Sequence, residues 1–377
     1  MDERYAVDPH RALPTSAYRP ASHQVDLDAI WHDDWVFVAT ADQVAAAGDW
    51  VAVTVGAQPV IVLRRQDGEL AAMSNLCAHR GTLLVDRSGS DKRFQCPYHA
   101  WTYSDTGRLL AVPHTRREDV DRDAHCLPTY RAEEWHGLVF VSLNPDVVTL
   151  AERLGHLEPL LAEANVDELH HWTADRREEE WRANWKLAIS NAMESYHLFK
   201  VHPETLEPYS PTAGAYYIVG SADGTATGGE SSRGGDDDYL LLSLPPNFVG
   251  AITGGTLLWQ AVQPLAADRV RVITGGAYPY PSPAASSGLK KWAGNAAAKA
   301  AEWAVPDFLP EDKAICERGQ RAASGDYRPG PLVPMEQVIV DFHHYLARQL
   351  HGADVPDVRT SADVGIPRRS EASAGSP

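Results

Sequence analysis

The stretch Cys77-Ala-His79-Arg80-Gly81, followed by Cys96-Pro-Tyr-His99-Ala-Trp101, determines how the rest of the chain is interpreted. It contains two pairs, each of one cysteine and one histidine that lie two or three residues apart. Thiolates and imidazoles are both good metal ligands, so each pair predicts half of a metal site. The order of the ligands matters, because a zinc finger usually carries both cysteines in one knuckle and both histidines in the other. Zinc is therefore the weaker alternative for this ligand set.

Two sulfur ligands on one iron and two imidazoles on the other describe a [2Fe–2S] cluster of the Rieske kind. Arg80-Gly81 after the first pair, and Pro97 and Ala100-Trp101 around the second, complete a pattern that closely resembles the cluster motif of Rieske-type oxygenase alpha subunits. We therefore expect the cluster to be held by Cys77, His79, Cys96 and His99.

The composition is that of a globular protein long enough for two domains. The chain has 377 residues, of which 44% are hydrophobic and 23% charged, and both fractions are ordinary for soluble proteins. The net charge of −17 argues against nucleic-acid or anionic-membrane partners, because phosphate binding needs a basic surface. A small-molecule substrate fits better.

The remaining cysteines and the chain ends favour a cytoplasmic protein. Of four cysteines, Cys126 and Cys316 stay outside the cluster motif, and we expect free thiols rather than a disulfide. The start of the sequence lacks the pattern of a signal peptide, and no apolar stretch is long enough to predict a membrane span.

Residues 36–146 are expected to form an antiparallel β domain. Trp50–Val55 and Pro59–Leu63 are apolar, β-branched runs on either side of a turn, and Gln66-Asp-Gly68 indicates a further hairpin. The Cys/His pairs then lie at the tips of two loops. Residues 1–35 are expected to form an N-terminal arm that packs on the second domain, with a short helix near Asp26–Asp34.

Residues 147–366 are expected to form the second domain, and residues 367–377 a disordered tail. Helices are predicted at Leu150–Ala164, from near Trp185, at Leu289–Ala304, from Pro310 to about Ala323, and at Glu336–Leu350. Strands are predicted at Trp172–Trp181, Tyr239–Leu242, Ala251–Ala261 and Val270–Ala277, and a mobile Gly-, Ser- and Asp-rich surface loop at Ser221–Asp238.

A second metal site is predicted at His197 and His202. Their five-residue spacing turns the two side chains about 140° apart on a continuous helix. Because Pro203 disfavours helical geometry at His202, we expect the helix to unwind after His197, so that both imidazoles reach one ion. Glu194 lies about one turn before His197 and is expected to accept a hydrogen bond from its other ring nitrogen. Taken alone, the pair is also compatible with a polar patch.

Two histidines and one carboxylate are the ligands of mononuclear non-haem Fe(II) oxygenases. In the family that this chain resembles, the carboxylate lies on a late helix with the pattern Glu-Asp … Glu … Gln. Here the pattern reads Glu311-Asp312 … Glu317 … Gln320. The resemblance therefore implies Asp312 as third ligand, with Asp341 and Glu311 as alternatives. The simpler interpretation is that both acids only favour the positive end of a helix.

With two metal sites in this order, the chain resembles Rieske oxygenase alpha subunits from about residue 15 to residue 350. The resemblance implies an α+β protein, with an N-terminal Rieske antiparallel β domain and a C-terminal catalytic domain whose large antiparallel sheet is covered by helices. It also implies a homotrimer in which Glu194 bridges His99 of one subunit and His197 of the next. Glutamate at the bridge resembles the branch of the choline, glycine betaine and carnitine monooxygenases.

The leading hypothesis is the terminal oxygenase component of a monooxygenase. It would insert one atom of O2 into a small organic substrate, by hydroxylation or by oxidative N- or O-dealkylation. Electrons from NAD(P)H would come through a ferredoxin or a flavin/iron–sulfur reductase, because the chain lacks a Gly-rich NAD-binding fingerprint. The alternatives are an aromatic ring dioxygenase that performs cis-dihydroxylation, and a Rieske electron carrier fused to a ligand-binding domain without mononuclear iron.

Several aromatic residues of the catalytic half could form a cage for a quaternary ammonium group, or could simply pack the core. They are Tyr216, Tyr217, Tyr239, Phe248, Trp259, Tyr278 and Tyr280.

Overall fold

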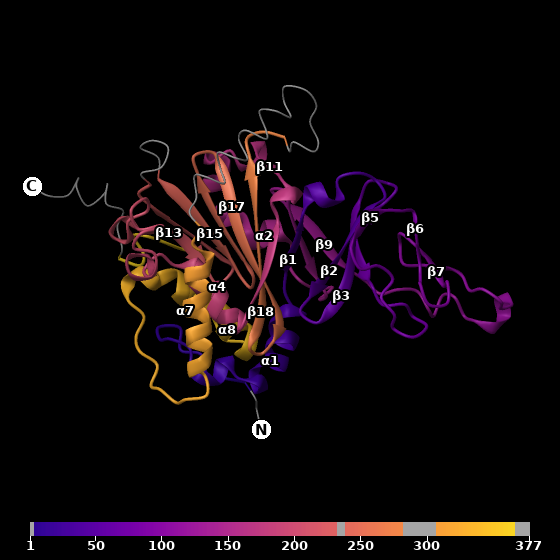
Figure 1. Ribbon diagram of the computed structural model, residues 1–377, viewed down its shortest axis with the longest axis horizontal. Coiled ribbons are helices and arrows are strands. Elements are labelled where there is room, and N and C mark those ends of the chain that lie inside the picture. The colour runs from indigo at the N-terminus through magenta and orange to yellow at the C-terminus, as the bar shows by residue number, and fades with distance from the viewer. Residues whose placement is uncertain (1–3, 232–237, 282–306, 366–377) are drawn as a thin grey trace, which may run out of the picture. The chain divides into compact units, whose positions relative to one another are not determined.

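The computed structural model of the chain describes residues 4–231, 238–281 and 307–365. The chain divides into two compact units, Trp31–Leu150 and the combination of Met1–Ile30 with Ala151–Pro377 (Figure 1). The helix predicted at Leu289–Ala304 and the tail predicted at 367–377 lie outside the described residues. No helix of the described part combines the length and the apolar character that a membrane crossing needs.

The unit Trp31–Leu150 is built from antiparallel strands. Seven strands form one sheet in the order β1-β10-β9-β4-β3-β2-β5, and β6, β7 and β8 form a second, small sheet. The strands are β1 Val36–Thr40, β2 Asp49–Val55, β3 Gln58–Arg64, β4 Leu70–Ser74, β5 Ser88–Ser90, β6 Arg93–Gln95, β7 Thr102–Ser104, β8 Leu109–Ala111, β9 Thr129–Trp135 and β10 Leu138–Ser142. The hairpins predicted around Gly56 and Gly68 are present, and both glycines have positive φ as tight turns require.

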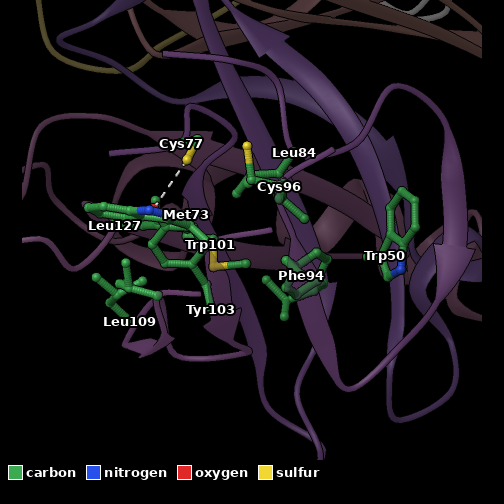
Figure 2. Packing of buried hydrophobic residues seen from close by; sticks show 13 residues of the cluster. Trp50, Met73, Cys77, Leu84, Phe94, Cys96, Trp101, Tyr103, Leu109 and Leu127 are labelled. Carbon is green, nitrogen blue, oxygen red and sulfur yellow. Dashed lines mark hydrogen bonds between the residues drawn. The ribbon is translucent and has the colours of Figure 1, made fainter. Parts of the chain in front are cut away.

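A compact apolar core lies beneath the Cys/His loops of this unit. Met73 from β4, Phe94 from β6 and Tyr103 from β7 are almost fully buried, together with both motif cysteines (Figure 2). Because apolar contacts fix the ends of these strands, the loops that leave them start from a rigid base.

The other unit contains a nine-stranded sheet whose strands pair antiparallel. Its order is β11-β18-β17-β16-β15-β14-β13-β19, and β12 also pairs with β18. The strands are β11 His170–His171, β12 Arg177–Trp181, β13 Tyr216–Ser221, β14 Gly224–Gly229, β15 Tyr239–Leu244, β16 Phe248–Thr253, β17 Thr256–Ala266, β18 Arg269–Tyr278 and β19 Arg359–Thr360. Together with the helices below, this confirms the predicted α+β class.

Two sequence predictions for this sheet are wrong. The supposed loop Ser221–Asp238 contributes strand β14, where glycines are required: a Cβ on Gly229 would lie 2.5 Å from the Tyr239 ring. The supposed single strand Ala251–Ala261 is a hairpin between β16 and β17, because Gly254 and Gly255 both have positive φ.

Three longer helices accompany this sheet. These are α4 Trp185–Met193, α7 Leu309–Ala322 and α8 Gln337–His351; the shorter α1 Pro20–Asp26, α2 Leu150–Leu154, α3 Glu158–Glu163 and α5 Leu198–Val201 complete the described set. Helices α4 and α8 pack against the sheet, and α7 packs against α4 (Figure 1). The predicted helix Leu150–Ala164 is split into α2 and α3 by a 3-10 turn. The predicted strand Trp172–Trp181 contains a 3-10 turn at Thr173–Asp175, and only its second half, β12, is a strand.

Helix α7 is held against the start of α4 by the last two residues of its Glu-Asp … Glu … Gln pattern. Glu317 accepts a hydrogen bond from the amide of Arg182 at 3.1 Å, and Gln320 accepts one from the amide of Asn184 at 2.8 Å. Asn184 itself caps α4 by accepting from the Lys186 amide at 3.0 Å. The two helices are therefore fixed in register, and this register places the first turn of α7.

The N-terminal segment is tied to α4 by a buried ion pair. The ammonium group of Lys186 donates to Asp26, and both side chains are excluded from solvent. Asp26 also accepts from the Trp185 indole and the Tyr5 hydroxyl, each at 3.0 Å. Burial lowers the pKa of Lys186, while the Asp26 charge opposes that change. The Asp26 carboxylate thus gathers three donors from the N-terminal segment and α4, which fixes the two against each other.

Replacing Asp26 by alanine is expected to lower the free energy of unfolding by about 3–5 kcal/mol, because it leaves the Lys186 charge buried without its carboxylate. Urea denaturation followed by circular dichroism measures the change. The control is Asp326→Ala, which breaks the exposed pair with Arg19 and is expected to leave the midpoint in place. Equal midpoints for the two variants would contradict the prediction.

Candidate functional site: two metal centres

The two Cys/His pairs lie in loops with matching backbone turns. In each loop the amide four residues after the cysteine donates to the cysteine carbonyl, from Gly81 to Cys77 at 2.8 Å and from Ala100 to Cys96 at 3.0 Å. Gly81 and Ala100 both have positive φ, 70° and 57° respectively. Although one pair is spaced by two residues and the other by three, the loops therefore share one design.

The side chains of the four motif residues gather at these loops. Cys77 and Cys96 are buried and form no disulfide. The rings of His79 and His99 lie 4.6 Å apart, centroid to centroid. The Nδ1 atoms of both rings are buried, and neither has a hydrogen-bond partner among the described residues. Buried polar atoms are normally satisfied, so two such nitrogens beside two free thiols fit the ligand set of a Rieske cluster.

Two aromatic residues support this group. The Tyr103 hydroxyl lies 3.3 Å from Cys77 Sγ and accepts a hydrogen bond from the Ala78 amide at 3.1 Å (Figure 2). The Trp101 ring stacks on His79 with an interplanar angle of 5°. Trp101 belonged to the predicted motif, whereas the role of Tyr103 was missed; the two aromatic residues lie two positions apart at and within β7, and this spacing was the available signal.

The second centre is formed by a chain segment that differs from the prediction. Helix α4 ends at Met193, Glu194 is extended, and the single turn α5 begins after His197. The helix is therefore interrupted before His197, whereas we expected it to unwind afterwards. The reason is the Glu194 carboxylate, which accepts from the amides of Tyr196 and His197 and so starts a new turn. The expected end of helical geometry at His202, before Pro203, is present.

His197, His202 and Asp312 come together at this break. One potential ligand atom from each lies within 4.8 Å of the others, an arrangement that could hold a metal ion. The Asp312 carboxylate oxygen lies 2.9 Å from His202 Nε2 and 3.5 Å from His197 Nε2. Asp312 belongs to the first turn of α7, and it is 6% exposed. Both imidazoles therefore point Nε2 at one buried carboxylate.

The opposite nitrogen of each imidazole is held by a glutamate. His197 Nδ1 donates to Glu194 Oε1 at 2.6 Å, and His202 Nδ1 donates to Glu311 Oε2 at 2.7 Å. The Thr205 hydroxyl also donates to Glu311 Oε2, at 2.6 Å. A carboxylate on Nδ1 fixes the tautomer that leaves Nε2 available for a metal. The contact of Glu194 was predicted, while the roles of Glu311 and Thr205 were missed.

The charges of the group agree with its geometry. Burial alone would lower the pKa of His197, but the contacts with Asp312 and Glu194 raise it to about 9. Burial would raise the pKa of Asp312, but the contacts with the two imidazoles lower it. Asp312 is thus held as a carboxylate, the form that binds metals.

Of the two alternative third ligands, neither takes the place of Asp312. Glu311 contacts the far nitrogen of His202. Asp341 lies on α8, where it accepts hydrogen bonds from Tyr217 and Arg359. The simpler interpretation of the acids is also partly right, since both Glu311 and Asp312 lie in the first turn of α7.

A pocket lies beside Glu194. Its wall includes Glu194, Tyr196, Tyr216 and Tyr217, with further lining from Ser195, Ala215, Thr227, Pro334, Met335 and Val338. Two of the seven aromatic residues considered from the sequence, Tyr216 and Tyr217, thus reach a cavity beside the site.

Comparison with known families agrees with both centres. Residues 34–131 match the Rieske [2Fe-2S] domain, and residues 164–352 match the catalytic domain of the ring-hydroxylating alpha subunit. The chain belongs to the ring-hydroxylating alpha-subunit family. The predicted family is confirmed, and membership implies a Rieske cluster and a mononuclear iron.

Relatives in the family act on different substrates. The glycine betaine monooxygenase oxygenase subunit of Chromohalobacter salexigens is 34% identical over 52% of this chain and 44% of its own length. The 2-halobenzoate 1,2-dioxygenase large subunit of Burkholderia cepacia is 33% identical over 47% and 40%. The carnitine monooxygenase oxygenase subunit of Escherichia coli is 31% identical over 54% and 56%. The matched regions thus span about half of these relatives.

Solved structures share the whole fold. A quaternary ammonium Rieske monooxygenase in complex with its substrate gamma-butyrobetaine has a TM-score of 0.76 at 22% identity, covering 93% of this chain and 99% of that one. Naphthalene 1,2-dioxygenase from Rhodococcus sp. has a TM-score of 0.74 at 19% identity, covering 90% and 93%. Both domains of the family are therefore present in one chain.

Replacing Glu311 by glutamine is expected to weaken iron binding by about 10–100-fold, because His202 loses the negative charge on its Nδ1 side. Competition with a ferrous chelator, followed by iron analysis, measures the affinity. Glu317→Gln on the same helix is the matched control, since a glutamine there still accepts the Arg182 amide. Iron retention in Glu311→Gln equal to that in the control would show that Glu311 has no such role.

Proposed function

We propose that the chain is the terminal oxygenase component of a Rieske non-haem iron monooxygenase, acting in the cytoplasm. The observation that carries this proposal is the convergence of His197 Nε2, His202 Nε2 and Asp312 on one point in a chain that also carries a cluster motif. Two imidazoles and one carboxylate leave coordination positions open, as an oxygenase requires.

We assign the residues of the two centres as follows. Cys77, Cys96, His79 and His99 would hold the [2Fe–2S] cluster; the free thiols and the unpartnered Nδ1 atoms support this. His197, His202 and Asp312 would hold the mononuclear iron.

When bound, the cluster supplies single electrons and the iron supplies the chemistry that activates O2. The protein's own contribution is orientation. Glu194 and Glu311 keep the imidazole Nδ1 atoms protonated and the Nε2 atoms free, and the buried position of Asp312 keeps competing water away.

Glu194 is proposed to carry electrons between subunits of a homotrimer. Its carboxylate contacts His197, and the residue also lines a pocket that a second group could enter. On the cluster side, His99 lies beside the exposed ring of Tyr98, at 3.7 Å between ring centroids. A bridge from His99 of one subunit to Glu194 of its neighbour is compatible with the pocket beside Glu194 and the exposed position of Tyr98 next to His99.

Quaternary ammonium compounds are the proposed substrate class. The relatives and neighbours that support it are a glycine betaine monooxygenase, a carnitine monooxygenase and a structure with bound gamma-butyrobetaine. Hydroxylation of a carbon beside nitrogen would release the dealkylated amine and an aldehyde. Electrons would come from NAD(P)H through a separate ferredoxin or flavin/iron–sulfur reductase.

Aromatic ring dihydroxylation is the second candidate, because a 2-halobenzoate dioxygenase subunit matches at almost the same identity. A third candidate, an electron carrier fused to a ligand-binding domain, has no use for a second ligand group. The gathering of His197, His202 and Asp312 therefore disfavours it.

The test is a substrate screen with a generic reductase, in which glycine betaine, carnitine and N-methyl compounds are compared with aromatic acids. We expect O2 uptake matched by aldehyde release only with the ammonium compounds. Metal analysis of the same sample should give about three irons per chain, two from the cluster and one mononuclear. A diol product from an aromatic acid supports the second candidate, and two irons per chain support the carrier.

Replacing Glu194 by glutamine is expected to weaken iron binding, because the amide nitrogen cannot accept a hydrogen bond as the carboxylate oxygen does. It is also expected to stop turnover in protein reloaded with excess ferrous iron, because the amide lacks the charge of the bridge. Iron analysis and steady-state O2 uptake measure the two effects. Glu204→Gln, an exposed acid ten residues later, should behave like the unchanged protein. Full coupled activity in Glu194→Gln would remove the bridging role.

A further inference from the structure

The strongest unexplained feature of the catalytic unit is the buried carboxylate of Asp341. It lies on α8 and is 1% exposed. Four donors from four elements surround it. Oδ2 accepts from the Tyr217 hydroxyl of β13 at 2.8 Å and from the Thr225 hydroxyl of β14 at 3.0 Å, while Oδ1 accepts from Arg359 of β19 at 2.6 Å and from Gln337 at 3.3 Å.

Among these donors, Arg359 supplies the positive charge. It belongs to the C-terminal strap, by which we mean residues 352–365, and its side chain is 22% exposed against 1% for Asp341. A buried carboxylate that loses its cation is left with an uncompensated charge. The strap therefore carries the counter-ion of a buried acid.

The strap also forms a hydrogen bond with β13 at a β-bulge. The pairing of β13 with β14 shifts register between Tyr217 and Val219, so Ile218 is an extra residue at a β-bulge. The Ile218 carbonyl accepts a hydrogen bond from the Ser361 amide of the strap at 3.0 Å. Bulges commonly re-aim the neighbouring side chain, and here that neighbour is Tyr217.

Tyr217 connects this network to the pocket beside Glu194. Tyr217 is one of the residues that line the pocket, and its hydroxyl donates to Asp341. The side chains of Asp341 and Thr225 pack closely against β13: a Cβ on Gly220 would lie 2.7 Å from Asp341 Oδ2 and 2.5 Å from the Thr225 hydroxyl. A movement of Asp341 is therefore transmitted to the pocket wall.

We propose that the C-terminal strap is a positioning element for this pocket, and that Arg359 is the positioning residue, acting through Asp341 on Tyr217. The consequence for turnover rests on the proposed function, in which the pocket borders the electron bridge. Arg359 touches neither metal centre nor pocket; its effect passes through one buried charge and one tyrosine hydroxyl.

The test is hydrogen exchange and single-turnover kinetics on the full-length, metal-loaded protein. Arg359→Gln should speed amide exchange at Tyr216–Val219 at least tenfold and slow the O2-driven oxidation of the reduced cluster at least fivefold, with iron content unchanged. Arg359→Lys should be intermediate. Arg359→Gln combined with Asp341→Asn should return both readouts toward the unchanged protein, because the buried charge is gone together with its cation.

The matched control is Arg348→Gln on α8, which breaks the ion pair with Asp223 and should leave exchange at Tyr216–Val219 unaltered. The proposal is overturned if Arg359→Gln changes exchange only within residues 352–365. Where Arg359→Gln does not fold, the double variant and Arg359→Lys decide in the same way. An unchanged protein whose cluster oxidation does not depend on mononuclear iron would refute the proposed function, while the exchange data would still judge the strap.

Discussion

The structure of the catalytic unit depends on one constraint: two imidazoles must turn their Nε2 atoms toward a single buried carboxylate. Glu194 and Glu311 meet this constraint from outside by binding the Nδ1 atoms of His197 and His202. An imidazole held at one nitrogen can present only the other. The two glutamates therefore fix both the tautomer and the orientation of each imidazole, as a preformed metal site requires.

This geometry is assembled from distant parts of the chain by contacts that serve no catalytic purpose themselves. Glu317 and Gln320 of α7 bind the amides of Arg182 and Asn184 just before α4, and that register brings Asp312 to the histidines. The buried pair of Lys186 and Asp26 then anchors α4 to the N-terminal segment. A sequence pattern such as Glu-Asp … Glu … Gln thus carries two functions on one helix: its first half approaches the metal site and its second half holds the helix in place.

The sequence predicted well where chemistry is local and less well where backbone geometry depends on the neighbours. Spacing and residue type were enough for the cluster motif and for the histidine pair. The position of the helix break was misplaced, because a side chain that caps its own backbone, Glu194, competes with the helix in a way that periodicity does not reveal. Strand β14 was missed because its glycines leave room for tyrosine rings of the neighbouring strands, and only the fold brings those rings close.

Three buried aspartates show why Asp312 differs from its alternative. Asp26 is paired with the ammonium group of Lys186, and Asp341 with the guanidinium group of Arg359. Asp312 faces two imidazoles whose other nitrogens are already bound to carboxylates. With neutral imidazoles, the group of Glu194, Glu311 and Asp312 carries three negative charges. A divalent cation at the Nε2 atoms would offset most of that charge; without one, protonation of the imidazoles offsets it, since these contacts raise the pKa of both rings. The charge balance, like the ligand geometry, therefore fits a metal at Asp312 better than one at Asp341.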